Sequence, residues 1–328
     1  MTDARGHPAY SDISTFLHLP WVHEPTAIAE AQPDIAIVGA PFDVAVTHRP
    51  GARFGPRAIR DASNLTAGSF HHLGLRIEPF NYLTGIDAGD AYCVPGDIQR
   101  GHDGVRAKIG ELLAASPRCV PIVLGGDHSI TYPSAATIAD HHDRKVGIVH
   151  FDAHADTADE SFGVSLSHGT PMRRLIEGGH VAGKNFVQVG LRGYWPPPAV
   201  VEWMAAQGMR SHFMSEIEER GFDAVIKDAI EEALDGPDLI YLSVDVDVLD
   251  PAFAPGTGTP EPGGLSAREL LRAVREITLR VELAALDVVE VSPPYDTAGI
   301  TAEVAHRVCC EAISALAARR RAAAHPSS

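Results

Sequence analysis

Short apolar runs recur along the chain, and stretches with the period of an amphipathic helix separate them. Continuous apolar runs of this length predict strands that are buried on both faces of a sheet. The segment Gly208–Met214 is a weaker, eighth candidate. The stronger runs are Ile35–Ala40, Leu83–Ala88, Cys119–Leu124, Val146–Phe151, Phe186–Leu191, Leu239–Val244 and Leu283–Val289.

Helical patterns fill most of the gaps between these runs. One of them begins with a capping box, because Ser266 is followed three residues later by Glu269. Strands that alternate with helices predict an α/β fold in which helices cover both faces of a mostly parallel sheet. The 328 residues contain no internal repeat or flexible linker, so one domain is expected. The helical patterns are Gly104–Ala115, Ser134–His141, Pro171–Glu177, Ala199–Gln207, Ala224–Leu234, Ala267–Thr278 and Thr301–Ala317.

Polar segments rich in Asp and His follow three of the apolar runs. In a parallel sheet, ligands bind beyond the carboxyl ends of the strands, which is where these segments lie. Alternate side chains of a strand share a face, so the acidic and imidazole groups within a segment converge if the strand stays extended. The candidate metal ligands are His128, Asp152, His154, Asp156, Asp245 and Asp247.

The chemistry of these six side chains indicates which metal they would bind. Four carboxylates and two imidazoles without a thiolate favour Mn²⁺ over structural Zn²⁺. Two divalent ions would neutralise the four carboxylates, and two ions that share a water can lower its pKa and present hydroxide. Asp127, next to His128, is expected to orient a ligand instead of binding metal. An isolated Asp-x-His-x-Asp segment could be an ordinary loop, but three such segments together predict a metal site.

The three segments resemble those of the ureohydrolases, the arginase and agmatinase family of binuclear manganese enzymes. Four further stretches agree with the agmatinase branch. The resemblance runs from about Ile35 to the last helix, which leaves an N-terminal arm of about residues 1–30 and a C-terminal tail of about residues 319–328. It implies a three-layer α/β/α fold around an eight-stranded sheet, as in arginases and deacetylases. The stretches are Arg49–Pro56, Ser167–Pro171, Asp250–Pro260 and Asp287–Pro293.

His168 and Glu290 are the residues outside the ligand set on which the expected chemistry depends. Without the resemblance, His168 would be an ordinary hydrogen-bonded loop histidine and Glu290 a capping residue at a strand end. The resemblance implies that His168 relays or donates a proton to the leaving amine. It implies that Glu290 accepts the substrate guanidinium, whose planar donors match a carboxylate. Asp156 is expected to take up the proton of the nucleophile while it remains a ligand.

The resemblance therefore implies a manganese amidinohydrolase, with two Mn²⁺ per chain, that cleaves a guanidino compound to urea and an amine. Agmatine is the first choice of substrate. The metal motifs leave 4-guanidinobutyrate, 3-guanidinopropionate, other guanidino acids and guanidine open. Specificity is expected to lie in the loop Thr157–Ser167 and at His48. His48 would bind a carboxylate tail, whereas Asp159 or Glu160 would bind an ammonium group. Alternatively, these side chains are simply solvated.

Two other classes of function remain as alternatives. A metal amide deacetylase on a related fold would be expected to use one zinc ion and fewer carboxylates. A non-catalytic relative would be expected to lack ligands, and none of the six is missing. Relatives commonly form trimers or hexamers, so a homo-oligomer is expected.

Composition limits the partners and the compartment. The formal charge of −16 argues against nucleic acid, and it either attracts a cationic small molecule or only keeps the protein soluble. No secretory signal or membrane-spanning run is evident, so a cytoplasmic location is expected. Four cysteines without CxxC spacing are expected to be reduced core residues. The Arg49–Pro56 loop is expected to be structural, and Arg319–Arg321 to be a solvated helix end.

Overall fold

A sheet of eight strands forms the centre of the molecule, and all its strand pairings are parallel. The computed structural model describes residues 8, 10–11, 13–67 and 70–324. The strand order is β2-β1-β3-β8-β7-β4-β5-β6, which confirms the predicted α/β fold and its eight-stranded sheet. The strands are β1 (Ile35–Ala40), β2 (Gly85–Asp90), β3 (Val120–Gly125), β4 (Val146–Phe151), β5 (Phe186–Leu191), β6 (Arg210–Phe213), β7 (Leu239–Asp245) and β8 (Glu282–Val289).

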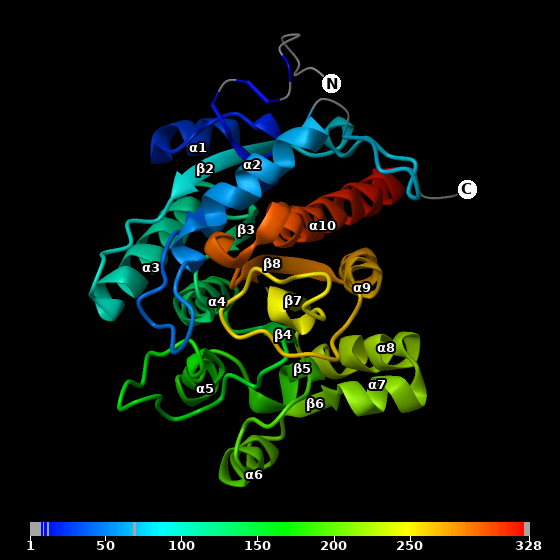
Figure 1. The fold of residues 1–328 in the computed structure, drawn as a ribbon. Coiled ribbons are helices and arrows are strands. Elements are labelled where there is room, and N and C mark those ends of the chain that lie inside the picture. The colour runs from blue at the N-terminus through cyan, green and yellow to red at the C-terminus, as the bar shows by residue number, and fades with distance from the viewer. Residues whose placement is uncertain (1–7, 9, 12, 68–69, 325–328) are drawn as a thin grey trace.

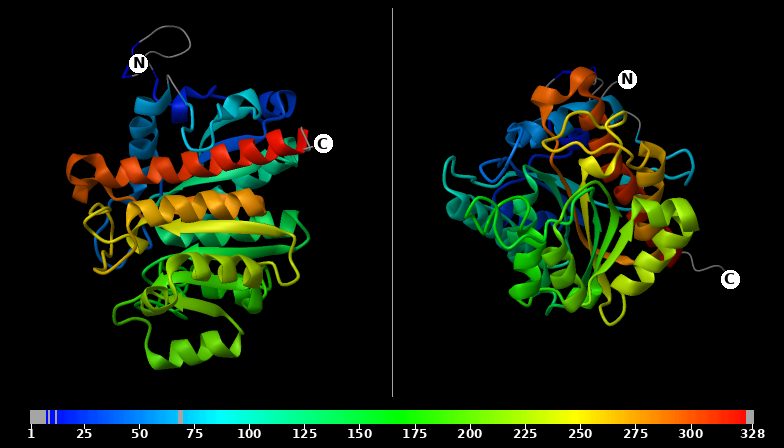
Figure 2. Two further views of the ribbon diagram at one scale, coloured as in Figure 1. Left: turned by 90° about the vertical axis from the view of Figure 1, so that its right-hand side faces the viewer. Right: turned by 60° about the horizontal axis from the view of Figure 1, so that its bottom comes forward.

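Helices cover both faces of the sheet, so the fold has three layers (Figure 1). One layer contains α2 (Gly55–Ala67), α7 (Met214–Arg220), α8 (Phe222–Ala233), α9 (Ala267–Arg280) and α10 (Ile300–Ala324). Within it, α9 and α10 lie side by side (Figure 2). The other layer contains α1 (Pro25–Ala31), α3 (Ile98–Ala115), α4 (Thr131–His141), α5 (Pro171–Glu177) and α6 (Pro198–Ala206). The strands are buried on both faces because each layer packs its apolar side chains against them.

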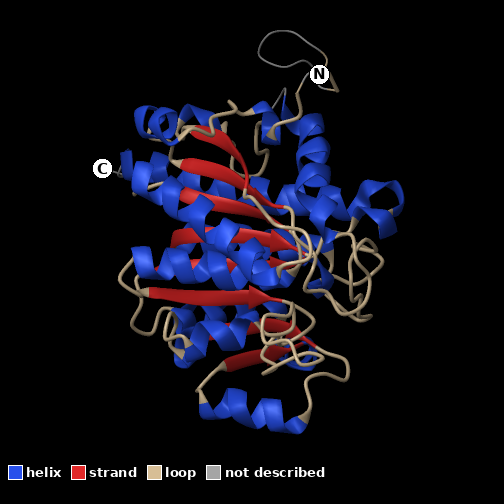
Figure 3. Ribbon diagram, turned by 90° about the vertical axis from the view of Figure 1, so that its left-hand side faces the viewer, coloured by secondary structure: helices blue, strands red, loops and turns tan. Residues whose placement is uncertain are grey.

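The order of the strands determines where a site can form. The chain passes from β1 outward to β2 and then back to β3, and it passes from β4 outward through β5 and β6 before it returns to β7. Crevices open where the strand order reverses, beyond the carboxyl ends of the strands. Figure 3 shows the loops gathered at this edge of the sheet. The central strands β3, β8, β7 and β4 end there next to one another.

The helix boundaries agree with the sequence except at a few places. The capping box of α9 is present, with Ser266 and Glu269 exchanging both hydrogen bonds. Helix α3 begins earlier than predicted because Asp97 accepts a hydrogen bond from the amide of Arg100 and caps it. Two short helices, α1 and α7, were not predicted.

Residues of the predicted N-terminal arm and of the predicted C-terminal tail contact the rest of the fold. Phe16 is buried in the core, and its amide donates a hydrogen bond to Asp87. Helix α10 continues through residue 324, and Arg320 pairs with Asp34 at 2.5 Å. Residues 319–324 therefore belong to the helical layer, while residues 325–328 lie outside the described residues.

The loop before α2 is anchored to the rest of the fold at Gly51, Arg53 and Gly55. Asp43 accepts a hydrogen bond from the amide of Gly51 at 2.7 Å and pairs with Arg53. At Gly55, where α2 begins, a β-carbon would lie 2.7 Å from the carbonyl oxygen of Val291 and 2.8 Å from that of Gly125. Only glycine fits there, so the loop is anchored to two of the strand ends that form the site.

All four cysteines are free thiols, and Cys119, Cys309 and Cys310 are buried, as predicted, whereas Cys93 is half-buried. Among the described residues, no helix is long and apolar enough to cross a membrane.

Candidate metal centre

All six predicted ligands lie at the carboxyl ends of three central strands, β3, β7 and β4, of which β7 and β4 are adjacent and β8 separates β7 from β3. His128 follows β3, Asp245 ends β7 with Asp247 just beyond it, and the other three follow β4. The Nδ1 atom of His128 lies 3.1 Å from one carboxylate oxygen each of Asp152, Asp156 and Asp245. Four side chains from three strands therefore meet at one point.

A second group of side chains lies beside the first. The Nδ1 atom of His154 is 3.0 Å from Asp247 Oδ2 and 3.5 Å from Asp152 Oδ1. The other oxygen of Asp152 faces His128. Asp152 thus lies between the two imidazoles and offers one oxygen to each group. This arrangement fits two adjacent cations that share a carboxylate.

The hydrogen bonds of His128 test whether these residues fit a metal ion. Ser243 donates its single hydroxyl proton to Asp287 at 2.8 Å, so it accepts a hydrogen bond from His128 Nε2 at 3.0 Å. His128 Nδ1 then presents its lone pair to three carboxylate oxygens, and such an arrangement needs a positive charge between the atoms. Burial alone would lower the pKa of His128, yet these carboxylates raise it well above its usual value. A proton supplies one charge, and a divalent cation that displaces it supplies two.

Burial makes the acidic cluster costly without cations. Asp152, Asp245 and Asp247 are all buried. Burial, together with the charges of Asp247 and Asp152, raises the pKa of Asp245 well above its usual range. Arg192 lies close by, but its guanidinium donates to backbone carbonyls such as that of Asp247, at 2.7 Å. The donor set therefore has the charge and the chemistry for hard or borderline divalent ions.

The ligands converge through turns and not through extended strands, so that part of the prediction was wrong. Strand β4 ends at Phe151, and Asp156 has a left-handed backbone with φ of 51°. Asp152 accepts a hydrogen bond from the amide of His154 at 2.6 Å, and Asp245 accepts one from Asp247 at 2.8 Å. In each segment the first aspartate bends the backbone, because its side chain binds the amide two residues later.

His150 is a residue of this site that the sequence analysis missed. Its Nδ1 lies 3.2 Å from Nε2 of the Gln188 side chain, and this amide nitrogen can only donate a hydrogen bond. His150 Nε2 therefore carries the proton and donates it to Asp152 Oδ2 at 2.8 Å. This bond orients the carboxylate that lies between the two groups. His150 and Asp152 are two residues apart at the end of one strand, so the period of a strand could have indicated it.

Asp127, which was expected to orient a ligand, binds backbone amides with both carboxylate oxygens. Its carboxylate oxygens accept hydrogen bonds from the amides of Ser129 and Ala45, each at 3.0 Å. Burial and the nearby charge of Glu290 raise the pKa of Asp127 to about 7. Asp127 therefore fixes the turn that carries His128.

Glu290 holds its carboxylate in the interior of the site. Its Oε1 accepts hydrogen bonds from the amide of His128 at 2.9 Å and from His168 Nδ1 at 3.1 Å. Its Oε2 is buried and has no partner among the described residues. A β-carbon at Gly258 would come within 3.1 Å of this oxygen. The backbone at Glu290 is left-handed, with φ of 64°, a conformation typical of functional sites.

His168 lies between Glu290 and Thr47. Its Nε2 is 3.2 Å from the amide nitrogen of Thr47 and 2.7 Å from its hydroxyl, so Nε2 accepts and Nδ1 carries the proton. Burial alone would lower the pKa of His168, but the hydrogen bond and charge of Glu290 raise it to about 9. The bond from the Thr47 amide belongs to the neutral ring. A ring with a pKa of about 9 takes up a second proton on Nε2 near neutral pH, and this proton breaks the bond from the amide.

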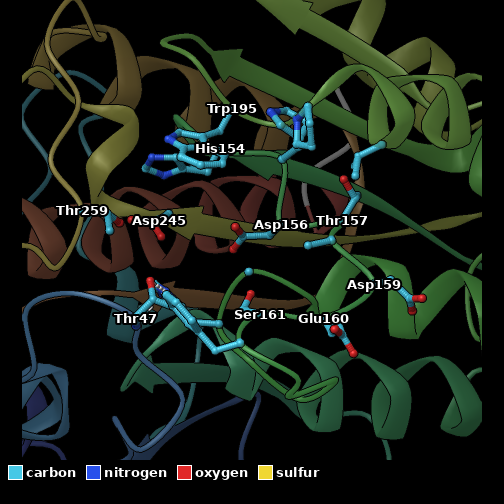
Figure 4. A pocket seen from close by; sticks show the side chains of 18 residues that line it. Thr47, His154, Asp156, Thr157, Asp159, Glu160, Ser161, Trp195, Asp245 and Thr259 are labelled. Carbon is cyan, nitrogen blue, oxygen red and sulfur yellow. Dashed lines mark hydrogen bonds between the residues drawn. The ribbon is translucent and has the colours of Figure 1, made fainter.

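A cavity of about 590 Å³ opens onto these groups. Its lining includes His168 and three candidate ligands that Figure 4 labels, His154, Asp156 and Asp245. A smaller cavity of about 270 Å³ shares His154, Trp195 and Thr259 with it.

The three predicted tail-binding residues lie at these cavities but differ in their surroundings. Asp159 and Glu160 line the larger cavity and His48 the smaller one. Asp159 is ion-paired, at 2.7 Å from Arg174. The hydrogen bond from Arg174 and the charge of Arg173 lower the pKa of Asp159.

The model of the arginase family matches residues 33–315. The chain belongs to the arginase family. It is 39% identical to guanidinopropionase of Pseudomonas aeruginosa, over 96% of this chain and 95% of that protein. It is 39% identical to the mitochondrial agmatinase of Gallus gallus, over 82% and 77%. Like other members of the arginase family, it is a hydrolase that acts on C–N bonds.

Solved structures agree with this assignment to the arginase family. The structure of proclavaminate amidino hydrolase from Streptomyces clavuligerus superposes with a TM-score of 0.85 and 35% identity, over 95% of this chain and 99% of that one. The Trypanosoma cruzi formiminoglutamase structure with Mn²⁺ has a TM-score of 0.78 and 25% identity, over 87% and 94%. The predicted three-layer fold is therefore confirmed.

Proposed function

We propose that this protein is a binuclear manganese amidinohydrolase that releases urea from a guanidino acid. His128, Asp156 and Asp245 would hold one ion, His154 and Asp247 the other, and Asp152 would contact both. This set supports the proposal because His128 Nδ1 presents its lone pair to three carboxylate oxygens at 3.1 Å. Bound between them, two divalent ions would lower the pKa of a shared water.

The unpartnered oxygen of Glu290 is the single observation that most supports guanidinium binding. Glu290 Oε2 is buried without a hydrogen-bond donor among the described residues, and a buried acceptor left in that state is unfavourable. A guanidinium N–H would satisfy it. Gly258 leaves the space beside this oxygen open, since a side chain there would crowd it. Because Oε1 is already fixed by His128 and His168, the bound guanidinium would have one defined position.

Asp156 and His168 would handle the protons. Both line the cavity, and Asp156 retains some exposure to it. We assign Asp156 to accept the proton of the attacking water. His168 would give a proton to the departing amine, because its ring can exchange a proton at Nε2 where Thr47 is bound. The carbon–nitrogen bond then breaks, and urea and an amine leave.

The tail of the substrate would carry a carboxylate and not the ammonium group of agmatine. Of the two acidic residues proposed for an ammonium, Asp159 is already neutralised by Arg174, and Glu160 lines only the larger cavity. His48 and Arg49 line the smaller cavity together with Glu261. Arg49 stacks over Tyr295 at 5.2 Å and forms no ion pair with a described residue, so its charge is available. The similarity to guanidinopropionase is consistent with this choice.

A panel of guanidino compounds tests the proposal. Urea release in the presence of Mn²⁺ is measured with agmatine, 4-guanidinobutyrate, 3-guanidinopropionate, arginine and methylguanidine. We expect higher kcat/KM for a guanidino acid than for agmatine, and His48→Ala should reduce the difference. A single charged pair corresponds to roughly tenfold or more in specificity. If agmatine is the better substrate, the carboxylate tail is rejected, and if no compound releases urea, the activity itself is rejected.

A further inference from the structure

Two exposed aromatic side chains, Phe162 and Trp195, line the large cavity. Phe162 is 93% exposed and Trp195 is 70% exposed, yet both belong to the lining of the cavity that contains Asp156 and His168. Figure 4 shows Trp195 beside His154 on one side and Ser161, the neighbour of Phe162, on the other. Large apolar side chains that remain exposed around a pocket often mark a place for a ligand.

The backbone at Phe162 is held in an unfavourable conformation for a bulky residue. Ser161 and Val164 form an antiparallel bridge, and the two residues between them have positive φ angles, 52° at Phe162 and 78° at Gly163. Such turns favour Asn or Asp before Gly, because those residues tolerate a left-handed backbone. A phenylalanine is uncommon in this conformation. The ring is exposed, so no buried contact offsets the strain. Because no folding contact explains this strained position, we attribute the ring to the function of the cavity.

Trp195 is the first residue of an apolar wall. Pro196, Pro197 and Val200 line the same cavity directly after it, where the chain enters α6. The tail of a small guanidino acid is a few methylene groups, and it would leave most of this wall uncovered. A cavity of about 590 Å³ is in the range of roughly 300–1,000 Å³ that holds much larger ligands.

We propose that the preferred substrate carries a bulky apolar group, a ring or a branched hydrocarbon, between its guanidino group and its carboxylate, and that Phe162 and Trp195 determine this specificity. The inference rests on the proposed amidinohydrolase activity. The guanidinium binds at Glu290 and the carboxylate near Arg49. Trp195 lines both cavities and Phe162 lines the larger one, so a bulky group carried between the two ends of the substrate would extend into the larger cavity. There it would bury apolar surface against both rings, which stabilises the complex.

A matched pair of substrates tests the proposal. The compounds are 4-guanidinobutyrate and 4-guanidino-2-phenylbutyrate, which release amines of closely similar basicity because the ring is distant from the reacting nitrogen. Methylguanidine, which has no tail, reports the chemistry alone. With the manganese-loaded enzyme we expect kcat/KM for the phenyl compound to exceed that for 4-guanidinobutyrate by roughly tenfold or more. Calorimetric binding of 4-amino-2-phenylbutyrate, the amine product, provides a measurement that does not require turnover.

Three variants assign the effect to the two rings. Phe162→Asn removes the ring but keeps a residue that accepts a left-handed backbone, and Trp195→Ala removes the other ring. Each should abolish the preference for the phenyl compound and leave methylguanidine turnover unchanged. Tyr194→Ala is the matched control, because Tyr194 is an exposed aromatic residue next to Trp195 in the chain that does not line the cavity. It should change nothing.

The outcomes separate this inference from the proposed activity. Absence of urea from all three compounds would reject the activity. Normal turnover of methylguanidine with equal or better turnover of 4-guanidinobutyrate than of the phenyl compound would overturn the inference alone. A change in subunit number in Phe162→Asn, with substrate preference retained, would assign the rings to a contact between copies of the chain and would also overturn it.

Discussion

Glu290 is tied to His128 by a hydrogen bond from the backbone amide of His128 to Glu290 Oε1, at 2.9 Å. The carboxylate that would bind the guanidinium is thereby fixed to the turn that carries a candidate metal ligand. Its position relative to the metal centre is set by the backbone of β3 and β8, two adjacent strands, and not by a mobile loop. A substrate bound at Glu290 Oε2 would be held at a defined distance from the centre, which is the geometric requirement for attack on its carbon.

Glu290→Gln should lower kcat/KM by roughly tenfold to a hundredfold, because a charge-assisted hydrogen bond becomes a neutral one. The amide oxygen can still accept from His128, so the fold and the manganese content should be unchanged. Urea release and metal analysis on the same sample check both points. Unaltered kcat/KM would remove Glu290 from guanidinium binding.

Gly258→Ala should weaken substrate binding by filling the space beside Glu290 Oε2. The new β-carbon would lie 3.1 Å from that oxygen and 3.4 Å from the carbonyl oxygen of Arg49. We expect a rise in KM with manganese content retained. Gly110→Ala is the control, since a β-carbon there in helix α3 meets nothing within 4 Å. It should leave KM unchanged and stabilise the helix by up to about 1 kcal/mol. Equal KM values in the two variants would contradict the assignment.

His150→Ala should weaken manganese binding by roughly 10- to 100-fold, the usual effect of losing a group that orients a ligand. The variant lacks the donor to Asp152 Oδ2, which lies between the two groups of ligands. Competition with a chelator measures the dissociation constant. His72→Ala, which removes a half-buried histidine that pairs with Glu311, is the comparison. A manganese affinity as high as that of His72→Ala would show that His150 does not orient the ligand.

His306 should make the protein less stable as the pH falls. It is buried on α10, and burial followed by the charge of Arg307 lowers its pKa from 6.5 to about 3. Below pH 6.5 the unfolded chain binds a proton that the folded chain does not. The native state therefore loses about 1.4 kcal/mol per pH unit from this group until the pH approaches 3.

His306→Gln should reduce the slope of the free energy of unfolding against pH by about 1.4 kcal/mol per pH unit, which corresponds to one proton. Free energies of unfolding from urea titrations at several pH values between 6.5 and 4 give the slope for each protein. His102, whose pKa burial lowers to about 4, is present in both proteins and cancels in the comparison. Parallel slopes would indicate that His306 is protonated in the folded state.

The sequence predicted best the features that residues close together in the chain determine. Strands such as β3 and β4 are continuous apolar runs, and the six candidate ligands lie within segments of a few residues, so both were predictable. The reason given for their convergence was wrong, because Asp152 and Asp245 bend the backbone by binding amides two residues ahead. The same residues converge in either geometry, which is why the prediction named side chains that the structure brings together.

The tail-binding region could not be predicted because tertiary contacts determine it. Asp159 is adjacent to Glu160 in the sequence, but Arg174 on α5 neutralises only Asp159. Trp195 and Arg49 are far apart in the sequence and line one small cavity. No local sequence pattern predicts such contacts. Phe162 resembles an ordinary loop residue in the sequence, and only the structure shows its positive φ angle.

The number of manganese ions bound per chain tests the central claim most directly. Metal-free protein is reconstituted with Mn²⁺, separated from free ions, and analysed for metal and protein. The geometry predicts two ions per chain in the wild-type protein. Asp152→Asn, which alters the residue that lies between the two groups of ligands, should retain less than one. A wild-type stoichiometry of one with full urea release, or a variant that still holds two, would contradict a binuclear centre built on these six side chains.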